Sequence, residues 1–288
     1  MRDLAKTLRI WGSEKPSFRA NDRVASFEGR APDALYSPEV NYDALYKHYG
    51  LEPRAFREKV ACLKDLTAIA AQNPILDVNW VTSADVMAQR ERRLQNGAFL
   101  QLAAIGVTLT KDNQVLVGVR GGKSTPERVK LFGSGLYGLP PGGSVKFGTS
   151  YAVDPITDTL MEEFHEEVGD FGITSCKPLG VFEAYLPGPE GIKFLGLIKT
   201  DASLDQIRKI NVEANRVHSD LTARGLKGAE LGAELKRRNL PEDAWEHSEI
   251  FGLPNDAKAI RAFLGKDREK FAGIGYGALD LYASALEQ

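Results

Sequence analysis

Long apolar blocks, each ended by a turn signal, run through the middle of the chain. Residues 98–110 (AFLQLAAIGVTLT) are almost continuously apolar, 111–113 supply Lys-Asp-Asn, and 114–120 (QVLVGVR) form a second apolar run. The pattern returns at 178–186 and 192–200, which are separated by a stretch rich in Pro and Gly. Short apolar runs bounded by turn residues are typical of paired strands. We therefore predict two β-hairpins.

The first 95 residues combine an irregular stretch with two predicted helices. Residues 27–42 contain several Gly and Pro residues and are expected to be irregular. Residues 42–49 and 53–72 are predicted to be helical, because apolar side chains in the longer segment recur at spacings of three and four. We interpret the pair as a cap on a larger domain and not as a DNA-binding helix-turn-helix, since no basic recognition face accompanies it.

The C-terminal third continues the mixture of helices and strands. Residues 203–240 are strongly charged and lack proline, so an inserted helical pair is expected there. Residues 245–254 resemble a short strand, and 255–265 resemble a capped helix that ends at Gly265. Strands and helices alternate unevenly. The pattern therefore predicts an α/β protein of the α+β type, with a mixed sheet sandwiched by helices, and excludes a doubly wound parallel sheet.

Length and composition are those of a soluble globular protein. The 288 residues suggest one large domain or two unequal ones, which we divide into an N-terminal extension (1–95) and a main domain (96–288). With 37 Lys+Arg against 39 Asp+Glu, bulk positive charge for nucleic-acid binding is lacking. Two cysteines exclude a disulfide framework, and no apolar window is long enough to span a membrane. Without a secretory signal pattern, the cytoplasm is the expected compartment.

The most informative segment is a predicted helix over 155–168. Asp154 followed by Pro155 is a favourable N-cap and first-turn pair, and Gly169 is a favourable residue just past the C-terminus. At 100° per residue, Glu163, Glu166 and Glu167 share an arc of about 100°. This arc borders the apolar stripe of Leu160, Phe164 and Val168, whereas Glu162 lies farther round and His165 points away.

Three carboxylates at the rim of a buried face repel one another. At about 6 Å each pair costs roughly 0.7 kcal/mol in water and near 3 kcal/mol at an effective dielectric constant of 20. A hard divalent cation with oxygen ligands would offset this repulsion. Upstream, Leu139-Pro140-Pro141-Gly142-Gly143 leaves a predicted strand. Paired glycines let backbone carbonyls approach a metal ion and backbone amides approach a phosphate.

Together these elements resemble the Nudix hydrolase family. The family box reads Gly, five residues, Glu, seven residues, Arg-Glu-apolar, one residue, Glu-Glu, one residue, Gly. Residues 163–169 (EFHEEVG) match its second half, and residues 139–143 resemble the Leu-Pro-Gly-Gly that precedes it, with one additional proline. The resemblance covers about 98–200 and 245–264 and leaves the N-terminal 95 residues unexplained.

Two departures distinguish this segment from the family pattern. Aligning Gly143 with the box glycine places Thr149 where the first glutamate belongs, and twelve residues then precede Glu162 in place of seven. We prefer this alignment, with a five-residue loop insertion. Counting back from the end of the box gives Gly148 and Asp154 at regular spacing but detaches the glycine pair. Glu162 stands where the family has an arginine that typically braces a helix glutamate, and it adds a fourth negative charge.

The resemblance implies a metal-dependent centre. Glu163, Glu166 and Glu167, with the carbonyl of Gly142, would hold Mg²⁺ or Mn²⁺, and Gly143 would lie against the substrate. The family cleaves a diphosphate that is joined to another moiety, usually in a nucleoside diphosphate derivative such as a sugar nucleotide or ADP-ribose.

Further roles are implied for residues outside the box. The family often places a general base on a later loop, where Glu249 stands, with Glu246 and Glu213 as rivals. Arg120 ends the second predicted strand, where a guanidinium could bind a phosphate through two hydrogen bonds. The adjoining polar loop adds Lys123 and Arg128.

Three functions stay open at this point. The first is a Mg²⁺-dependent pyrophosphohydrolase, and the second is a Nudix-fold binding or regulatory module that recognises a nucleotide-like ligand without cleaving it. The third is another enzyme of the same fold, such as a diphosphate isomerase, which no feature favours. The expected partner is a small nucleoside diphosphate-linked molecule, without nucleic acid or membrane. Residues 1–95 would complete the pocket or form a homodimer contact, and 203–240 would act as a lid.

Overall fold

A computed structural model describes most of the C-terminal two thirds of the chain and parts of the N-terminal third. The described residues are 3–11, 16–20, 59–63, 66–71, 74–82, 100–122, 129, 132–145, 155–185, 187 and 191–288. Of the sequence predictions, the helix over 42–49 and the irregular stretch over 27–42 lie outside these residues.

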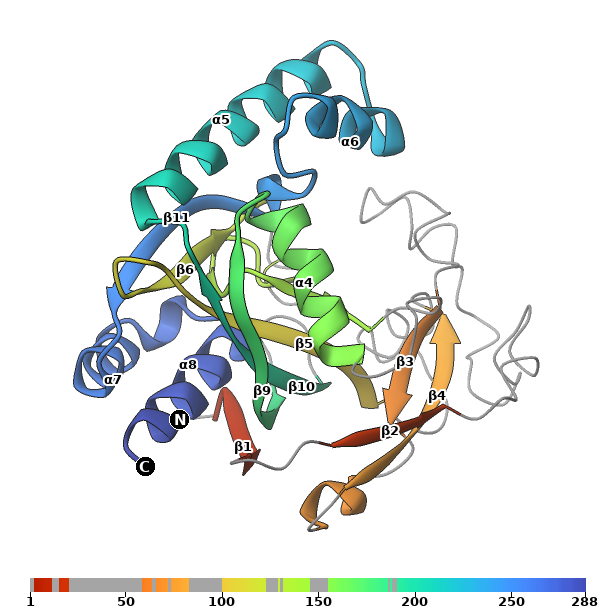
Figure 1. Ribbon diagram of the computed structural model, residues 1–288, viewed down its shortest axis with the longest axis vertical. Coiled ribbons are helices and arrows are strands. Elements are labelled where there is room, and N and C mark those ends of the chain that lie inside the picture. The colour runs from red at the N-terminus through yellow and green to blue at the C-terminus, as the bar shows by residue number, and fades with distance from the viewer. Residues whose placement is uncertain are drawn as a thin grey trace.

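One curled sheet of eleven strands organises the described residues (Figure 1). Its longest path runs β1-β9-β10-β5-β3-β4-β2, while β6, β7, β8 and β11 branch from β5 and β6. The sheet is mixed, since β10 pairs with β5 in parallel and with β9 antiparallel. The strands are β1 (Ala5–Ile10), β2 (Ser17–Ala20), β3 (Lys59–Leu63), β4 (Ile75–Thr82), β5 (Leu100–Leu109), β6 (Gln114–Arg120), β7 (Tyr137–Gly138), β8 (Gly142–Ser144), β9 (Ile173–Ala184), β10 (Gly191–Thr200) and β11 (His247–Pro254).

Five α-helices cover the sheet in the described part of the chain, together with three short 3₁₀ helices. They are α4 (Pro155–Glu167), α5 (Leu204–Ala223), α6 (Gly228–Arg237), α7 (Ala257–Lys266) and α8 (Gly273–Leu286), with η4 (Thr67–Ala70), η5 (Ala244–Glu246) and η6 (Arg268–Lys270). Helix α4 packs on one face and α8 on the other (Figure 1), and each face has its own apolar core. The predicted α+β class, with a mixed sheet between helices, is confirmed.

Most elements predicted from the apolar pattern are present. Both hairpins form, as β5–β6 and β9–β10, and the turn of the first uses Asn113 at a positive φ of 59°. The inserted helical pair is α5 and α6, and the strand and helix expected after it are β11 and α7. Helix α7 begins at an Asp256 cap whose carboxylate accepts a hydrogen bond from the Ala259 amide.

The helix predicted over 53–72 is wrong in its described part. Residues 59–63 form β3 and residues 67–70 form η4. Strand β3 pairs with β4 on one side and with β5 on the other, so Val60, Cys62 and Leu63 are buried by sheet packing that a helical periodicity does not anticipate. The N-terminal third therefore contributes strands to the sheet, and the proposed boundary at residue 95 stays a prediction.

Helix α8 was not predicted, because its sequence GIGYGALDLYASAL contains three glycines, which disfavour helix. Their role is close packing. A Cβ on Gly273 would lie 2.0 Å from the carbonyl oxygen of Tyr185, and one on Gly275 would lie 2.6 Å from that of Tyr137. The helix can approach the sheet only where these side chains are missing.

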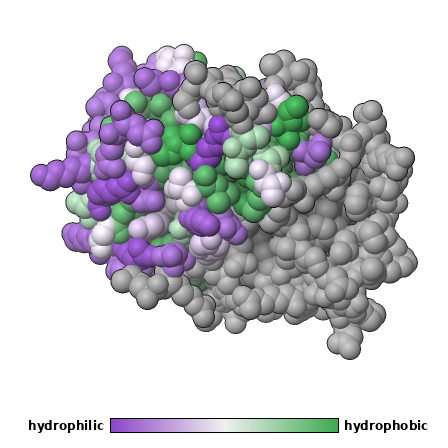
Figure 2. All heavy atoms as spheres, turned by 90° about the horizontal axis from the view of Figure 1, so that it is seen from below, coloured by the Kyte–Doolittle hydropathy of each residue, from purple (hydrophilic) through white to green (hydrophobic). Residues whose placement is uncertain are grey.

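The surface of the described part is mixed. In Figure 2, hydrophilic residues cover most of the coloured surface, with apolar patches between them. A search of the described helices found none with the length and apolar character needed to cross a membrane.

Candidate functional site

Helix α4 carries its glutamates at the edge of its buried face, as the helical projection predicts. Glu163 and Glu167 are buried, with 8% and 2% of their surfaces exposed, and Glu166 is half-buried. Glu162 and His165 are exposed. The apolar stripe that draws this face onto the sheet consists of Ile156, Leu160, Phe164 and Val168.

The glycine pair of β8 lies directly against these glutamates. The Gly142 amide donates a hydrogen bond to Oε1 of Glu167 at 3.1 Å. A Cβ on Gly143 would lie 1.8 Å from Oε1 of Glu163, so no larger residue fits there without moving that carboxylate. The two glycines thus let β8 lie close to the carboxylates of α4. The approach of their backbone groups to a metal ion or a phosphate stays a prediction.

The two prolines before the glycines are anchored on β5. The carbonyl of Pro141 accepts a hydrogen bond from the Gly106 amide at 2.7 Å, and that of Pro140 accepts one from the Thr108 hydroxyl at 3.0 Å. A Cβ on Gly106 would lie 2.7 Å from the Pro141 ring. The additional proline is therefore accommodated by a glycine on the neighbouring strand, and the loop holds β8 under α4.

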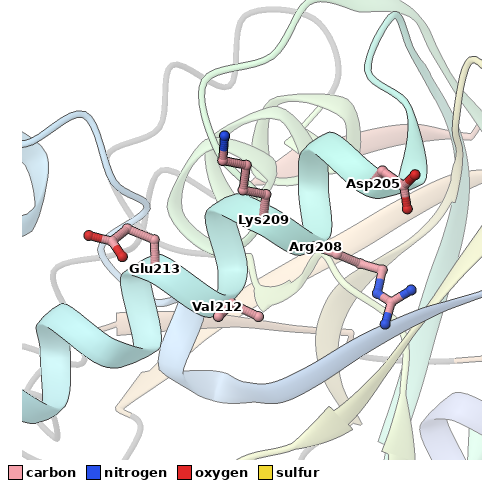
Figure 3. Close-up of a pocket in the computed structure, with 5 residues that line it drawn as sticks. All are labelled: Asp205, Arg208, Lys209, Val212 and Glu213. Atoms are coloured by element: carbon pink, nitrogen blue, oxygen red, sulfur yellow. The ribbon is translucent and has the colours of Figure 1, made fainter.

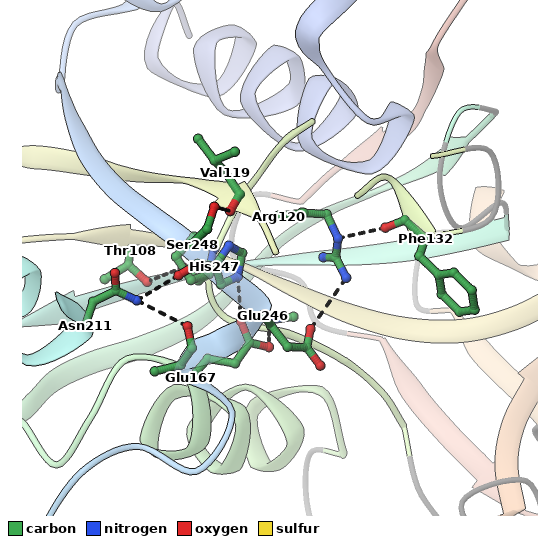
Figure 4. Close-up of polar contacts among 12 residues, drawn as sticks. Thr108, Val119, Arg120, Phe132, Glu167, Asn211, Glu246, His247 and Ser248 are labelled. Atoms are coloured by element: carbon green, nitrogen blue, oxygen red, sulfur yellow. Dashed lines mark hydrogen bonds and ion pairs between the residues drawn. The ribbon is translucent and has the colours of Figure 1, made fainter. Parts of the chain in front are cut away.

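A buried histidine that sequence reasoning missed completes the surroundings of Glu167. His247 is fully buried, and its Nε2 lies 3.0 Å from Oε2 of Glu167 (Figure 4). Its Nδ1 is buried without a hydrogen-bond partner and faces Gly118, where a Cβ would lie 2.2 Å away. A proton on Nδ1 would be a buried, unsatisfied donor. We therefore assign the proton to Nε2, which donates to Glu167.

Arg120 and Glu246 lie beside this pair. The Arg120 guanidinium donates from Nε to the Phe132 carbonyl at 2.8 Å, and its Nη2 lies 3.5 Å from Oε2 of Glu246 (Figure 4). Glu246 is the last residue of η5, the short helix that follows the inserted helices α5 and α6. Arg120 thus supplies positive charge next to the acidic residues, while the family's arginine position is occupied by the exposed Glu162.

Burial sets the protonation of this cluster. It raises the pKa of Glu167, against the lowering effects of the Gly142 amide and of Arg120. Burial likewise lowers the pKa of His247 to about 3, so the imidazole is neutral at pH 7. Burial and the neighbouring Glu167 charge raise the pKa of Glu246 to about 7. Carboxyl groups with raised pKa values that share a cluster are typical of functional sites.

The structure separates the candidates for the general base. Glu249 is exposed on β11, on the side of the strand opposite to Ile250, which packs into the core beneath α4. Glu213 is paired with Arg216 on the outer face of α5. Glu246 is the rival that the structure brings to Glu167 and Arg120. Lys123, Arg128, Gly148, Thr149 and Asp154 lie outside the described residues.

The residues of this cluster fit a hard divalent cation in their chemistry. Glu163, Glu166, Glu167 and Glu246 offer carboxylate oxygens, which Mg²⁺ and Mn²⁺ prefer. Over the residues that the structure describes, no three His, Cys, Asp or Glu side chains already converge as a metal-binding group. Glu167 meets the Gly142 amide at Oε1 and His247 Nε2 at Oε2, and it also makes a side-chain hydrogen bond with Glu163. A carboxylate has about four lone-pair sites, so Glu167 retains capacity for a cation.

Comparison with known proteins gives structural neighbours only. No family model and no curated protein sequence matches the chain. Among solved structures, the pyrophosphohydrolase BsRppH of Bacillus subtilis aligns with 37% of this chain at 14% identity and a TM-score of 0.24. The MutT protein of Methanosarcina mazei Go1 aligns with 65% at 11% identity and a TM-score of 0.33. The Nudix domain of Shewanella oneidensis NrtR, complexed with ADP ribose, aligns with 38% at 16% identity and a TM-score of 0.27. The chain spans 54%, 96% and 64% of these three chains.

Proposed function

We propose that the protein hydrolyses a diphosphate linkage in a nucleoside diphosphate derivative and requires Mg²⁺ or Mn²⁺. The observation that carries the proposal is the burial of Glu163 and Glu167 against the glycine pair of β8. Burying two carboxylates costs free energy unless a cation or hydrogen-bond donors offset it. Glu167 meets the Gly142 amide, the His247 ring and the Glu163 carboxyl group, and a divalent ion would offset the negative charge of the two glutamates.

The residues of α4 are the proposed metal ligands. Glu163, Glu166 and Glu167 would hold the ion, and the Gly142 carbonyl remains a candidate fourth ligand. A bound ion neutralises the diphosphate and lowers the pKa of the attacking water. The chain contributes positioning: the Gly142 amide and His247 fix the Glu167 carboxylate from two sides.

Glu246 is the proposed general base. A pKa of about 7 keeps a substantial fraction ionised at neutral pH and still lets the carboxylate accept a proton effectively. Arg120 holds Glu246 in place and supplies the guanidinium that a substrate phosphate would meet. Glu249, the base suggested by its place in the sequence, is exposed on the other side of β11.

A binding or regulatory module is the second candidate. Two observations favour it: Glu162 replaces the family's arginine, and the described carboxylates do not yet converge on one point. Such a module would bind the same class of ligand and release it unchanged.

A substrate panel separates the two candidates. Nucleoside diphosphate sugars, ADP-ribose, dinucleotides and nucleoside triphosphates are incubated with the protein, with and without Mg²⁺. Metal-dependent product formation that disappears in Glu166→Gln and Glu167→Gln, and persists in the control Glu213→Gln, supports hydrolysis. Micromolar binding by calorimetry without any product would favour the module, and neither binding nor turnover would contradict both.

A further inference from the structure

A chain of buried polar contacts connects the inserted helix α5 to the glutamates of α4. Asn211 lies on the inner face of α5 with 2% of its surface exposed. Its Nδ2 donates to the carbonyl oxygens of Ala244 at 3.2 Å and His247 at 3.0 Å. Asn215, one helical turn later, donates to the same two carbonyls at 3.3 and 3.1 Å. Two side-chain amides thus hold both ends of the four-residue segment 244–247.

This segment presents the groups that meet Glu167. Glu246 leaves it toward Arg120, and the His247 ring leaves it toward Glu167 (Figure 4). The backbone at its end is irregular, because the β11–β6 register shifts between His247 and Glu249. Strand pairing therefore does not by itself set where the His247 ring points, and the amides of α5 supply the missing restraint.

We propose that His247 is the positioning residue of Glu167 and that Asn211, with Asn215, holds His247 for this task. The inference rests on the proposed function, since it assigns Glu167 a role that needs a fixed orientation. The inserted helices then act as a support for the centre, in place of the lid that their position in the sequence suggested. Outer partners that orient ligating carboxylates affect metal affinity by about 10–100-fold.

The experiment combines a structural and a binding readout on the full chain. ¹⁵N-labelled protein without metal is studied by long-range imidazole NMR, which distinguishes Nε2–H from Nδ1–H. We expect one of the four histidines to be neutral, protonated on Nε2 and slow in hydrogen exchange, with its signal absent in His247→Gln. The same signal should shift or exchange faster in Asn211→Leu, and stay unchanged in the control Lys209→Gln on the exposed face of α5.

Binding of Mn²⁺, followed by the electron paramagnetic resonance signal of the free ion, gives the second readout. We expect His247→Leu and Asn211→Leu to weaken Mn²⁺ binding by about 10–100-fold. His247→Gln should recover most of the affinity, because the Gln amide can donate near the position of Nε2. His165→Gln, at an exposed position of α4, is the matched histidine control. If Asn211→Leu does not fold, the half-buried Asn215→Leu takes its place.

The outcomes separate the inference from the function. If both His247→Leu and Asn211→Leu bind Mn²⁺ as tightly as the wild type, the inference is overturned while the proposed function stands. A proton found on Nδ1 of His247 would also overturn the inference. If the wild type itself binds no Mn²⁺, the proposed function fails. The ring signal alone then decides the inference: its response to Asn211→Leu supports the contact chain, and an unchanged signal overturns it.

Discussion

Two sets of helical glutamates in this molecule show opposite electrostatics. On the inserted helices, Glu213 and Glu234 are half-buried and have exposed arginines three or four positions away. Glu213 lies 2.6 Å from Arg216, and Glu234 lies 2.8 Å from Arg237. These arginines lower both carboxyl pKa values, that of Glu234 to about 2. On α4, Glu167 is buried between an amide and a neutral imidazole, and its pKa is raised.

The surroundings of Glu213 show that the glutamates of the inserted helices belong to an ordinary charged helix surface. Figure 3 shows a hollow on α5 lined by Asp205, Arg208, Lys209, Val212 and Glu213, in which both acids lie four positions from Lys209. Opposite charges three or four positions apart on a helix surface attract each other. On α4, by contrast, Glu163 and Glu167 are buried, with 8% and 2% of their surfaces exposed. A glutamate-rich helix is therefore informative where its acids are buried.

The largest effect should separate the two sets by activity. We expect Glu167→Gln and Glu163→Gln to lower the kcat/KM for the substrate found in the panel by about 100-fold or more, because each removes a charge proposed to hold the metal. The same change at Glu213 or Glu234 should leave kcat/KM within about twofold. Steady-state kinetics in saturating Mg²⁺ measure all four variants.

If Glu213→Gln lowered kcat/KM as much as Glu167→Gln, the proposed difference between the two sets of glutamates would be contradicted. Circular dichroism and thermal unfolding of each variant serve as the control for folding. Glutamine keeps the shape of the side chain, so an unfolded Glu167→Gln protein would indicate a structural role for the charge itself.

The next largest effect should be on stability, when a side chain is added in the tightly packed space beside His247. Gly118→Ala should lower the free energy of unfolding by about 1–3 kcal/mol, because the new Cβ would lie 2.2 Å from Nδ1 of His247 and the ring is enclosed. Gly265→Ala in α7 is the matched control. A Cβ there meets nothing within 4 Å, so alanine should stabilise the helix by about 0.5–1 kcal/mol. Urea unfolding of both variants measures the difference, and equal stability of the two would contradict the tight packing of His247.

Local periodicity was enough to predict which side chains of α4 lie at its buried edge. Counting 100° per residue from Glu163 placed Glu167 at the buried edge and left Glu162 and His165 outside, as the structure has them. The glycine pair was predicted from its composition alone to bring backbone groups close to a ligand, and the structure shows it close to Glu163 and Glu167. Such features follow from the geometry of one element and need no knowledge of its neighbours.

Contacts between distant segments were not predictable in this way. His247 meets Glu167 across 80 positions, and Asn211 contacts residues 33 and 36 positions later. The choice of Glu249 as base did not take account of the register shift between His247 and Glu249. Glu249 is exposed, whereas Glu246 lies in η5 beside Arg120. A lone histidine at the start of a predicted strand was the only signal in the sequence.

A smaller effect should appear in the pH dependence of stability. The pKa of Glu246 is about 7 in the folded protein and near 4.5 when unfolded, so between these values the folded state holds the proton and the unfolded state does not. Stability from this group is therefore present below pH 4.5 and is lost as pH rises toward 7. Its side chain is 31% exposed, which reduces the effect to about 1–2 kcal/mol. Relative to the wild type, Glu246→Gln should become more stable over this window in metal-free denaturant titrations. A constant difference between the two proteins would contradict the raised pKa.

The smallest effect concerns Glu234 on the inserted helices. Its contribution to stability changes with pH in the direction opposite to that of Glu246. The pKa of Glu234 is lowered to about 2 by Arg237 and Arg238, so its contribution is present above pH 4.5 and is lost as pH falls toward 2. Because Arg237 and Arg238 are exposed, we expect Glu234→Gln to lower the melting temperature only slightly at pH 7 and not at all near pH 2. Raising the salt concentration to 1 M should remove the difference at pH 7, since exposed pairs are screened. A difference that survives both conditions would mean that Glu234 stabilises the helix through packing, and the contrast with Glu246 would then not be one of charge alone.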